Sequence, residues 1–280
     1  MTTSCCGPAL RGPDLHTMVI RMDVRGFLID LDGVLYIGDQ AIDGAQEAIG
    51  LLKEKNYRLR FVSNTTRTCR KTIAGRLARL GFDIPESSIF TPPLAAIARM
   101  NAAGKHRCML LTTGDVFKDF EQWCDRSIED GKTDYVVVGD AGDKMTYENL
   151  NAAFRAVSDG AEIIALEKDR YWMAPDGFML SAGPFVAALE FATGKTATVM
   201  GKPSRAFFEM ALRDMDLRPE ETAMIGDDII TDIAGARKAG MKAVLVKTGK
   251  YREEAVRGAP VQPTKIIDSI ASISTVLVQP

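Results

Sequence analysis

Asp30 and Asp32 directly follow the apolar residues 26–29, in the order Asp30-Leu31-Asp32-Gly33. Residues two apart in an extended segment point to the same side, so both carboxylates face one direction. Two carboxylates held this close repel each other, and the repulsion favours a bound cation or a shared proton. Taken alone, the pair is also compatible with an ordinary strand that ends in an Asp-Gly turn.

A second acidic cluster follows the apolar residues 222–225. Gly226 precedes Asp227 and Asp228 there, and Asp232 follows one helical turn later. The alternative explanation is helix capping, with Asp228 as the N-cap and Asp232 in the first turn, near the positive end of the helix dipole. Capping and a functional role are both open for this cluster.

Two further polar groups occupy comparable places. Ser63 and Asn64 follow the apolar end of residues 58–62, and Lys202 lies in Gly201-Lys202-Pro203-Ser204, just before a helical pattern. Ser63 and Asn64 could equally form a turn or a cap. A lysine before a helix is more commonly a solvated residue than a functional one.

Strand and helix patterns alternate along the chain, which predicts an α/β fold with a largely parallel sheet. We expect strands at residues 26–29, 58–62, 108–111, 135–138, 163–166, 222–225 and 243–246. We expect helices at residues 45–55 (with Asp43 as N-cap), 69–80, 116–124, 147–158, 185–193, 205–214 and 229–239. Because ligands bind beyond the carboxyl ends of such strands, the positions of Asp30, Ser63 and Asp227 suit a site.

Residues 92–194 have elements of their own and are predicted to form an inserted second domain. Residues 23–91 and 195–280 would then form one discontinuous core, and residues 1–22 an irregular extension. A hairpin is expected in the insertion, with arms at 170–173 and 178–181 and a turn at Pro175-Asp176-Gly177. Near it, Lys168, Arg170 and Tyr171 could hold a second phosphate or a base, or could simply pack within the domain.

The composition excludes several classes of protein. The chain has 280 residues, with 35 Lys and Arg against 37 Asp and Glu, and its charge of -2 gives no reason to expect nucleic acid or a membrane surface as partner. It contains neither a secretory signal nor an apolar run of ~20 residues, so we expect a cytoplasmic protein. Its two histidines argue against a zinc site or a Ser-His-Asp hydrolase, and its five cysteines are expected to be reduced thiols.

Taken together, the four clusters resemble the four motifs of the haloacid dehalogenase (HAD) superfamily. Residues 32–36, 61–66 and 199–204 are also similar to its branch of NagD-like nucleotidases and para-nitrophenyl phosphatases. The resemblance covers everything beyond the N-terminal extension. It implies a doubly wound, mostly parallel, Rossmann-like core with an inserted smaller α/β cap, and this branch carries its cap between the second and third motifs, where residues 92–194 lie.

The resemblance also implies a mechanism. Asp30 would attack phosphorus and form an aspartyl phosphate, for which an already ionised carboxylate needs no histidine. Asp32 would protonate the leaving oxygen and later deprotonate the attacking water. Lys202 would neutralise charge around Asp30, and Ser63 and Asn64 would donate hydrogen bonds to the transferring oxygens.

The implied cofactor is Mg²⁺, which prefers oxygen ligands. The side chains of Asp30 and Asp227 and the backbone carbonyl of Asp32 would hold it, with one substrate oxygen. Asp228 and Asp232 would support the ion from behind these ligands or through water, and the sequence does not rank the two.

Two alternatives from other classes are a receiver-like phosphoacceptor and a binding or scaffold protein on the same fold. In receivers, the phosphorylated Asp lies on a different strand from the acid pair. The substrate is expected to be a small phosphorylated molecule, and a nucleoside monophosphate, a sugar phosphate, pyrophosphate and a phospho-amino acid are all compatible. The resemblance also makes a homodimer through the cap a candidate assembly.

Overall fold

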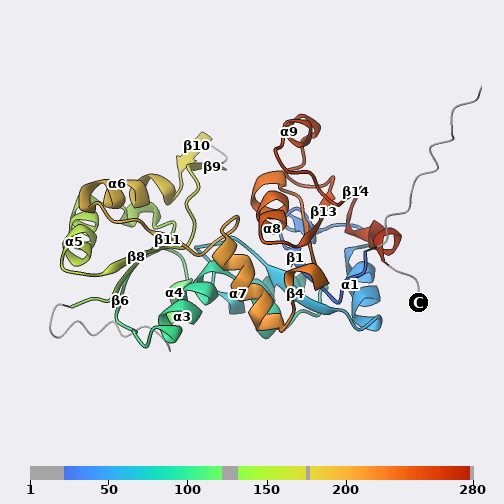
Figure 1. The fold of residues 1–280 in the computed structure, drawn as a ribbon, viewed down its shortest axis with the longest axis horizontal. Coiled ribbons are helices and arrows are strands. Elements are labelled where there is room, and N and C mark those ends of the chain that lie inside the picture. Colours follow the sequence, from blue (N-terminus) through green and yellow to red (C-terminus); the bar gives the residue numbers. More distant parts are fainter. Residues whose placement is uncertain (1–21, 122–131, 175–176, 278–280) are drawn as a thin grey trace, which may run out of the picture.

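The computed structural model describes residues 22–121, 132–174 and 177–277 (Figure 1). Apart from Met22, the expected extension over residues 1–22 lies outside the described residues, as do Cys124 and the expected turn residues Pro175 and Asp176. No helix in the described part of the chain is long and apolar enough to span a bilayer.

The larger sheet contains, among the described residues, six parallel strands in the order β14-β13-β12-β1-β4-β5. These strands are β1 (Gly26–Asp30), β4 (Arg58–Val62), β5 (Ile89–Phe90), β12 (Thr222–Gly226), β13 (Lys242–Val246) and β14 (Lys265–Ile267). The register places Asp30 beside Val62 and Ile29 beside Ile225. Segments that follow β1, β4 and β12 therefore leave the sheet at the same edge.

The side chains of β1 alternate between two apolar layers, one on each face of this sheet. Phe27 and Ile29 belong to one layer and Leu28 to the other. The first layer includes α1 (Ala45–Glu54), α2 (Arg70–Arg79) and the 3-10 helix η5 (Ile270–Val276), and the second includes α3 (Pro92–Ala102), α7 (Arg205–Met215) and α8 (Gly235–Lys238). Helices thus cover both faces of a parallel sheet, which is the doubly wound, Rossmann-like α/β architecture that the sequence predicted.

The smaller sheet contains, in the described ranges, four parallel strands in the order β11-β8-β7-β6. They are β6 (Cys108–Leu111), β7 (Tyr135–Val138), β8 (Glu162–Ala165) and β11 (Thr198–Val199), and the helices α5 (Tyr147–Ser158) and α6 (Gly183–Thr193) cover one face. An antiparallel hairpin of β9 (Tyr171–Ala174) and β10 (Gly177–Leu180) projects from it. Figure 1 shows the two sheets at opposite ends of the long axis.

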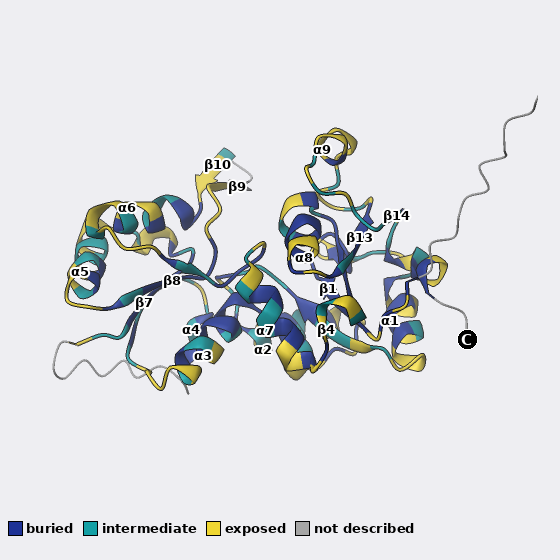
Figure 2. Ribbon diagram, viewed as in Figure 1, coloured by how far each residue is buried: buried dark blue, intermediate teal, exposed yellow. Residues whose placement is uncertain are grey.

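The other face of the smaller sheet shares an apolar cluster with the larger one. Leu166 and Met200 belong to the same cluster as Phe90, Phe207 and Ala96 of α3. The rings of Phe90 and Phe207 meet edge to face at 5.3 Å. In Figure 2, buried residues run continuously through both sheets and the helices between them, whereas the β9–β10 hairpin is largely exposed. The two sheets are therefore joined by packing as well as by chain connections.

Several expected elements have the predicted bounds, namely β4, β6, β7 and α5. Other elements differ. The N-cap of α1 is Gly44 in a left-handed conformation, not Asp43, and the expected helix over residues 229–239 begins as the π-helical turn η4 (Ile229–Ala234). α3 was not expected, because alanines occupy both its buried positions (Ala95, Ala96) and its exposed ones (Ala98, Ala102), which blurs the amphipathic pattern.

The remaining elements of the described ranges are short. They are β2 (Tyr36–Ile37), β3 (Gln40–Ala41), α4 (Phe117–Phe120), α9 (Glu253–Arg257) and the 3-10 turns η1 (Glu86–Ser88), η2 (Gly142–Lys144) and η3 (Pro219–Glu221). The expectation of reduced thiols holds for Cys69, which is free and buried, but is wrong for Cys108, which is disulfide-bonded. Sequence spacing does not reveal which cysteines approach each other in space.

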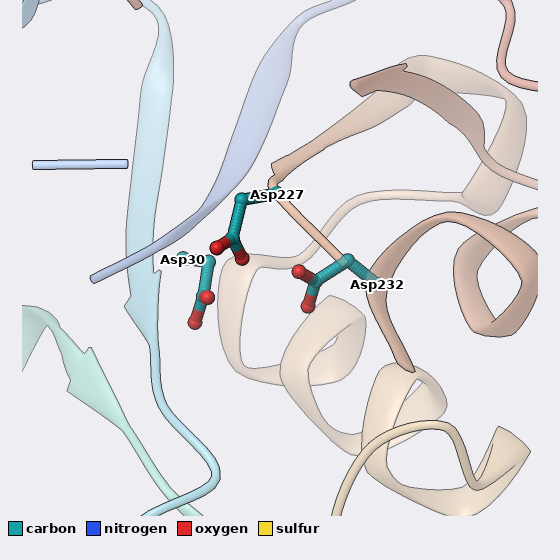
Figure 3. Close-up of side chains that lie close together, drawn as sticks. All are labelled: Asp30, Asp227 and Asp232. Atoms are coloured by element: carbon teal, nitrogen blue, oxygen red, sulfur yellow. The ribbon is translucent and has the colours of Figure 1, made fainter. Parts of the chain in front are cut away.

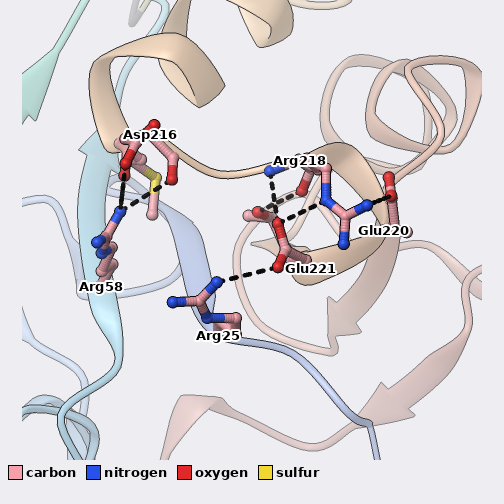
Figure 4. Close-up of polar contacts among 8 residues, drawn as sticks. Arg25, Arg58, Asp216, Arg218, Glu220 and Glu221 are labelled. Atoms are coloured by element: carbon pink, nitrogen blue, oxygen red, sulfur yellow. Dashed lines mark hydrogen bonds and ion pairs between the residues drawn. The ribbon is translucent and has the colours of Figure 1, made fainter.

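Exposed charged residues lie at the amino ends of β1, β4 and β12 (Figure 4). Arg25 and Arg218 each lie 3.1 Å from a carboxylate oxygen of Glu221. The hydrogen bond from Arg218 is the main reason that the pKa of Glu221 is lowered to about 2. Arg58 donates to the carbonyl oxygens of Met215 and Asp216, each at 2.8 Å, and so satisfies the carboxyl end of α7.

Candidate active site

Three buried carboxylates converge at the carboxyl ends of the central strands (Figure 3). Asp30 is the last residue of β1, Asp227 follows β12 directly, and Asp232 lies in η4. One oxygen from each carboxylate can be chosen so that all three lie within 4.8 Å of one another. The parallel register brings the first two together, and the tight turn between β12 and η4 brings Asp232 beside them.

Lys202 is the cation of this cluster. Its Nζ donates to Asp30 Oδ1 and to Asp232 Oδ1, each at 2.7 Å, and the residue is only 3% exposed. It lies in the loop between β11 and α7, where Ser204 begins the helix by accepting a hydrogen bond from Phe207 N–H. The lysine is therefore not a solvated residue before a helix.

Asn64 holds the main chain of Lys202. Its Oδ1 accepts from Lys202 N–H at 2.8 Å, and its Nδ2 donates to the Lys202 carbonyl at 3.1 Å. Both ends of the amide are thus engaged with one residue of the loop. Ser63 lines the neighbouring cavity, where its Oγ accepts from Thr65 N–H at 3.3 Å and its own proton can still be donated.

The electrostatics of the cluster favour a cation. Burial raises the pKa of Asp227 to about 6 and that of Asp232 to about 7, and it also raises the pKa of Asp30 despite the nearby Lys202. Burial lowers the pKa of Lys202, but the charges of Asp232 and Asp30 more than offset this, and the pKa is raised. Three buried acids face one buried lysine, and the exposed Lys250 acts on them from outside the cluster, so negative charge is in excess in this buried place.

The free carboxylate oxygens indicate where a cation fits. Both oxygens of Asp232 are engaged, one by Lys202 and the other by Asp228 N–H at 3.2 Å. One oxygen of Asp227 accepts from Lys250 N–H at 2.6 Å, and one oxygen of Asp30 accepts from Lys202. Within the described residues, no hydrogen bond engages Oδ1 of Asp227, and the all-oxygen donor set of the three acids suits a hard divalent ion such as Mg²⁺.

Two glycines make room for the Asp227 carboxylate. Gly33 has φ +82° and Gly249 has φ +57°, and a Cβ added to either would lie 2.0 Å from Asp227 Oδ2. Only glycine combines this backbone conformation with such an approach. Gly33 therefore leaves the space that the carboxylate of Asp227, at the end of the neighbouring strand, occupies.

Asp228 and Asp232 occupy different places. Asp228 Oδ1 accepts from Ile230 N–H at 2.8 Å and from Thr231 N–H at 3.0 Å, so it caps η4 as the capping interpretation anticipated. Asp232 is fully buried within the acid cluster. Of the two acids, Asp232 is the one that lies with Asp30 and Asp227.

The acid cluster opens into a cavity of about 1040 Å³. Its lining includes Asp30, Asp32, Ser63 and Lys202, and also the segment from Lys168 to Trp172. The three residues singled out in the insertion, Lys168, Arg170 and Tyr171, all line this cavity. Lys168 in addition forms an ion pair with Glu190 at 2.6 Å.

Glu167 supports this wall and was not expected from the sequence. Its buried carboxylate accepts from Ser181 Oγ at 2.6 Å and from Ala182 N–H at 2.8 Å, and also from Asp169 N–H. It therefore ties together the two ends of the segment that includes the β9–β10 hairpin. A lone Glu after an apolar strand carries no signal that distinguishes it from a surface residue.

Arg76 and Lys250 also line the cavity without having been expected. Lys250 follows β13, and the same strand-end rule that drew attention to Asp30 and Asp227 could have found it. Arg76 lies in the last turn of α2, within an ordinary basic helix pattern, and no sequence rule marks it.

Comparisons with known proteins agree with this geometry. Two family models match, one described as HAD-hydrolase-like over residues 199–273 and one as haloacid dehalogenase-like hydrolase over residues 27–123. Haloacid dehalogenase-like hydrolase domain-containing protein 2 of Bos taurus is 44% identical, over 87% of this chain and 93% of that protein. Phospholysine phosphohistidine inorganic pyrophosphate phosphatase of Homo sapiens is 37% identical, over 91% of this chain and 95% of that protein.

Solved structures are similar along almost the whole chain. The 4-nitrophenylphosphatase of Thermotoga maritima has a TM-score of 0.83 and 28% identity, and the match covers 91% of this chain and 98% of that one. NagD of E. coli K-12 has a TM-score of 0.81 and 27% identity, with 91% and 100% covered. The chain belongs to the haloacid dehalogenase-like hydrolases, as an enzyme of their NagD-like phosphatase branch.

Proposed function

We propose that this enzyme is a Mg²⁺-dependent phosphatase that hydrolyses a small phosphorylated substrate through an aspartyl phosphate on Asp30. The observation that carries the proposal is the contact of Lys202 with Asp30 beside the buried Asp227 and Asp232, at the base of a large cavity. A carboxylate beside a buried lysine can act as a nucleophile without a separate base, because the lysine and a bound cation both favour its ionised form.

The first step would transfer the phosphoryl group. A carboxylate oxygen of Asp30 forms a bond to phosphorus while the bond from phosphorus to the leaving oxygen breaks. Asp32, which lines the same cavity, gives its proton to that oxygen. Lys202 then stabilises the negative charge that gathers on the transferring oxygens, and the Ser63 hydroxyl donates a hydrogen bond to them.

The second step would hydrolyse the aspartyl phosphate. Asp32, now a carboxylate, removes a proton from water, and the hydroxide oxygen bonds to phosphorus while the bond to Asp30 breaks. Phosphate leaves, and Asp32 again holds the proton that the first step needs. We assign Asn64 to holding the Lys202 loop in register, because its amide is engaged with that main chain.

Mg²⁺ would be held by the side chains of Asp30 and Asp227 and by the Asp32 carbonyl, with Asp232 and Asp228 behind them. The ion would neutralise the charge shared by the acids and the phosphate. Asp232 keeps Lys202 beside Asp30, and Asp228 fixes the turn that presents Asp227 and Asp232. Loss of the ion should therefore abolish turnover without unfolding the chain.

The substrate would extend from the acid cluster toward the wall formed by Lys168, Arg170 and Tyr171. One relative's name specifies phospholysine, phosphohistidine and inorganic pyrophosphate, and another's specifies 4-nitrophenyl phosphate. These compounds, nucleoside monophosphates and sugar phosphates form the panel to test. A cytoplasmic location, a homodimer through the cap, and the division into core residues 23–91 and 195–280 and cap residues 92–194 stay predictions.

The test is phosphate release from this panel, including para-nitrophenyl phosphate, in Mg²⁺ and in excess chelator. We expect turnover in Mg²⁺ and none in chelator. In samples quenched rapidly with acid, we expect phosphate bound covalently to Asp30. Full turnover in chelator would exclude the metal. A single phosphorylation without turnover would instead indicate a receiver-like phosphoacceptor, and tight binding without reaction a scaffold.

A further inference from the structure

The carboxylate of Asp32 depends on the main chain for its position. Among the described residues, no hydrogen bond or ion pair holds this side chain, which is exposed on the cavity wall. Its backbone pairs with Tyr36 in an isolated β-bridge, and the next amide, Gly33 N–H, donates to the Tyr36 carbonyl at 2.8 Å. The place of Asp32 thus follows from the place of Tyr36.

Tyr36 begins the β2–β3 hairpin, which is too short to be rigid by itself. Each arm has two residues, and Gly38 and Asp39 form the turn. Ile37 is 52% exposed, so the hairpin gains little burial near its tip. An isolated two-stranded hairpin is at best marginally stable in water. A contact from outside must therefore keep it in one position.

Arg76 provides that contact from α2. Its Nη2 donates to the Gly38 carbonyl at 2.6 Å and to Asp39 Oδ1 at 3.1 Å. Its guanidinium carbon lies 4.6 Å from the centroid of the Tyr36 ring, in a cation–π contact. One side chain on a packed helix therefore touches the start and the turn of the hairpin.

The Tyr36 side chain interacts with this arginine and is also within electrostatic reach of the acids. The ring is buried, and burial is the main reason that its pKa is raised to about 12. The charge of Arg76 lowers this pKa, while the charges of Asp32 and Asp30 raise it. Arg76, Tyr36, Asp32 and Asp30 also line one cavity. A shift of the Tyr36 ring would therefore change the surroundings of Asp32, the residue that transfers the proton.

We propose that Arg76 is a positioning residue for Asp32, which clamps the β2–β3 hairpin to α2 and so fixes the main chain that presents the proton-shuttling carboxylate. The inference rests on the proposed phosphatase mechanism. Its consequence is specific, because a misplaced acid affects the step in which the leaving oxygen takes a proton. Displacement by about 1 Å can cost on the order of 100-fold in rate.

The test varies the leaving group. Arg76→Ala, Arg76→Lys and wild type are compared by kcat/KM on aryl phosphates whose leaving groups have pKa values from about 4 to about 10. A good leaving group departs without a proton, so we expect Arg76→Ala to be near wild type on 2,4-dinitrophenyl phosphate. On phenyl phosphate we expect a loss of about 10- to 100-fold. Lysine can still donate to Gly38, so Arg76→Lys should recover part of that loss.

Arg79→Ala is the matched control, because Arg79 lies three residues further along α2 and lines the same cavity, while among the described residues no hydrogen bond or ion pair joins it to the hairpin. We expect it to keep the wild-type dependence on leaving group. An equal loss on every aryl phosphate in Arg76→Ala would mean that the arginine binds the substrate, and no loss would mean that it positions nothing. Either result overturns the inference, whereas full activity of Asp30→Asn would instead overturn the proposed function.

Discussion

The two ends of the same three strands carry charged clusters of opposite character. At the amino ends of β1, β4 and β12, arginines are exposed and each has carboxylate or carbonyl partners (Figure 4). Arg25, for example, keeps 64% of its side chain accessible while it pairs with Glu221. At the carboxyl ends, three buried acids lie together (Figure 3), and the buried Lys202 contacts two of them, Asp30 and Asp232.

The pKa shifts of the two clusters have opposite signs. The pKa of Glu221 is lowered, chiefly because Arg218 donates to its ionised form. The pKa values of Asp227 and Asp232 are raised, chiefly because burial penalises their ionised forms. The amino-end cluster is complete as it stands and suits a structural role. The carboxyl-end cluster is stable only with protons or a further cation, which is typical of a functional site.

The largest expected effect comes from removing the nucleophile. Asp30→Asn should lower kcat by about 10⁴-fold or more, since an amide cannot form the aspartyl phosphate. Steady-state phosphate release and rapid-quench detection of phosphoenzyme measure this. Asp216→Asn, at the amino-end cluster, should keep wild-type turnover. Retention of phosphoenzyme in Asp30→Asn would place the nucleophile elsewhere.

The next effect comes from the buried cation. Lys202→Met should lower kcat by about 10²- to 10³-fold, because charge on the transferring oxygens loses its partner. It should also cost about 3–5 kcal/mol of stability at neutral pH, since buried acids are left unpaired. The stability loss should shrink at pH 5, where these acids can take up protons. Chemical denaturation at both pH values measures this, with Arg25→Met as the exposed control; equal losses for the two variants would contradict the distinction.

Metal binding should reverse the pH dependence of the acid cluster. The folded state holds protons on Asp227 and Asp232 more tightly than the unfolded state, so metal-free stability should fall as pH rises from 3.8 to about 7. Mg²⁺ binds the ionised acids and should raise Tm more at pH 7.5 than at pH 5. Thermal melts with and without Mg²⁺ test this, and Asp227→Asn should lose most of the shift. A Mg²⁺ shift independent of pH would argue against binding at these carboxylates.

The smallest effect is expected at the amino ends. Glu221→Gln should leave kcat unchanged and should lower Tm by less than about 2 °C, because exposed ion pairs contribute little. The lowered pKa of Glu221 supplies stability that is present above pH 4.5 and is lost as pH falls toward 2. Melts across this range should therefore differ less in the variant. A large change in turnover would show that the two ends of the sheet are coupled.

Local sequence patterns were sufficient for the outline of the fold and for most of the acid cluster. Asp30 and Asp227 could be placed at strand ends because apolar runs of strand length precede them, and parallel strands end at one edge. Gly33 could be recognised as a turn residue, but not as the space beside Asp227. The motif order also allowed Lys202 to be assigned to the site, although its own surroundings looked like those of a surface lysine.

The sequence by itself determined which residues are available at each strand end and on which side they point, because the strand and helix periods are set within a few residues. Only the tertiary structure decided their partners. Lys202 meets Asp30 across 172 positions and Asn64 across 138, and Arg76 meets the hairpin turn across 38. Such contacts depend on how the crossovers and helices pack. The packed fold therefore decides that Asp228 caps a turn while Asp232 binds the lysine.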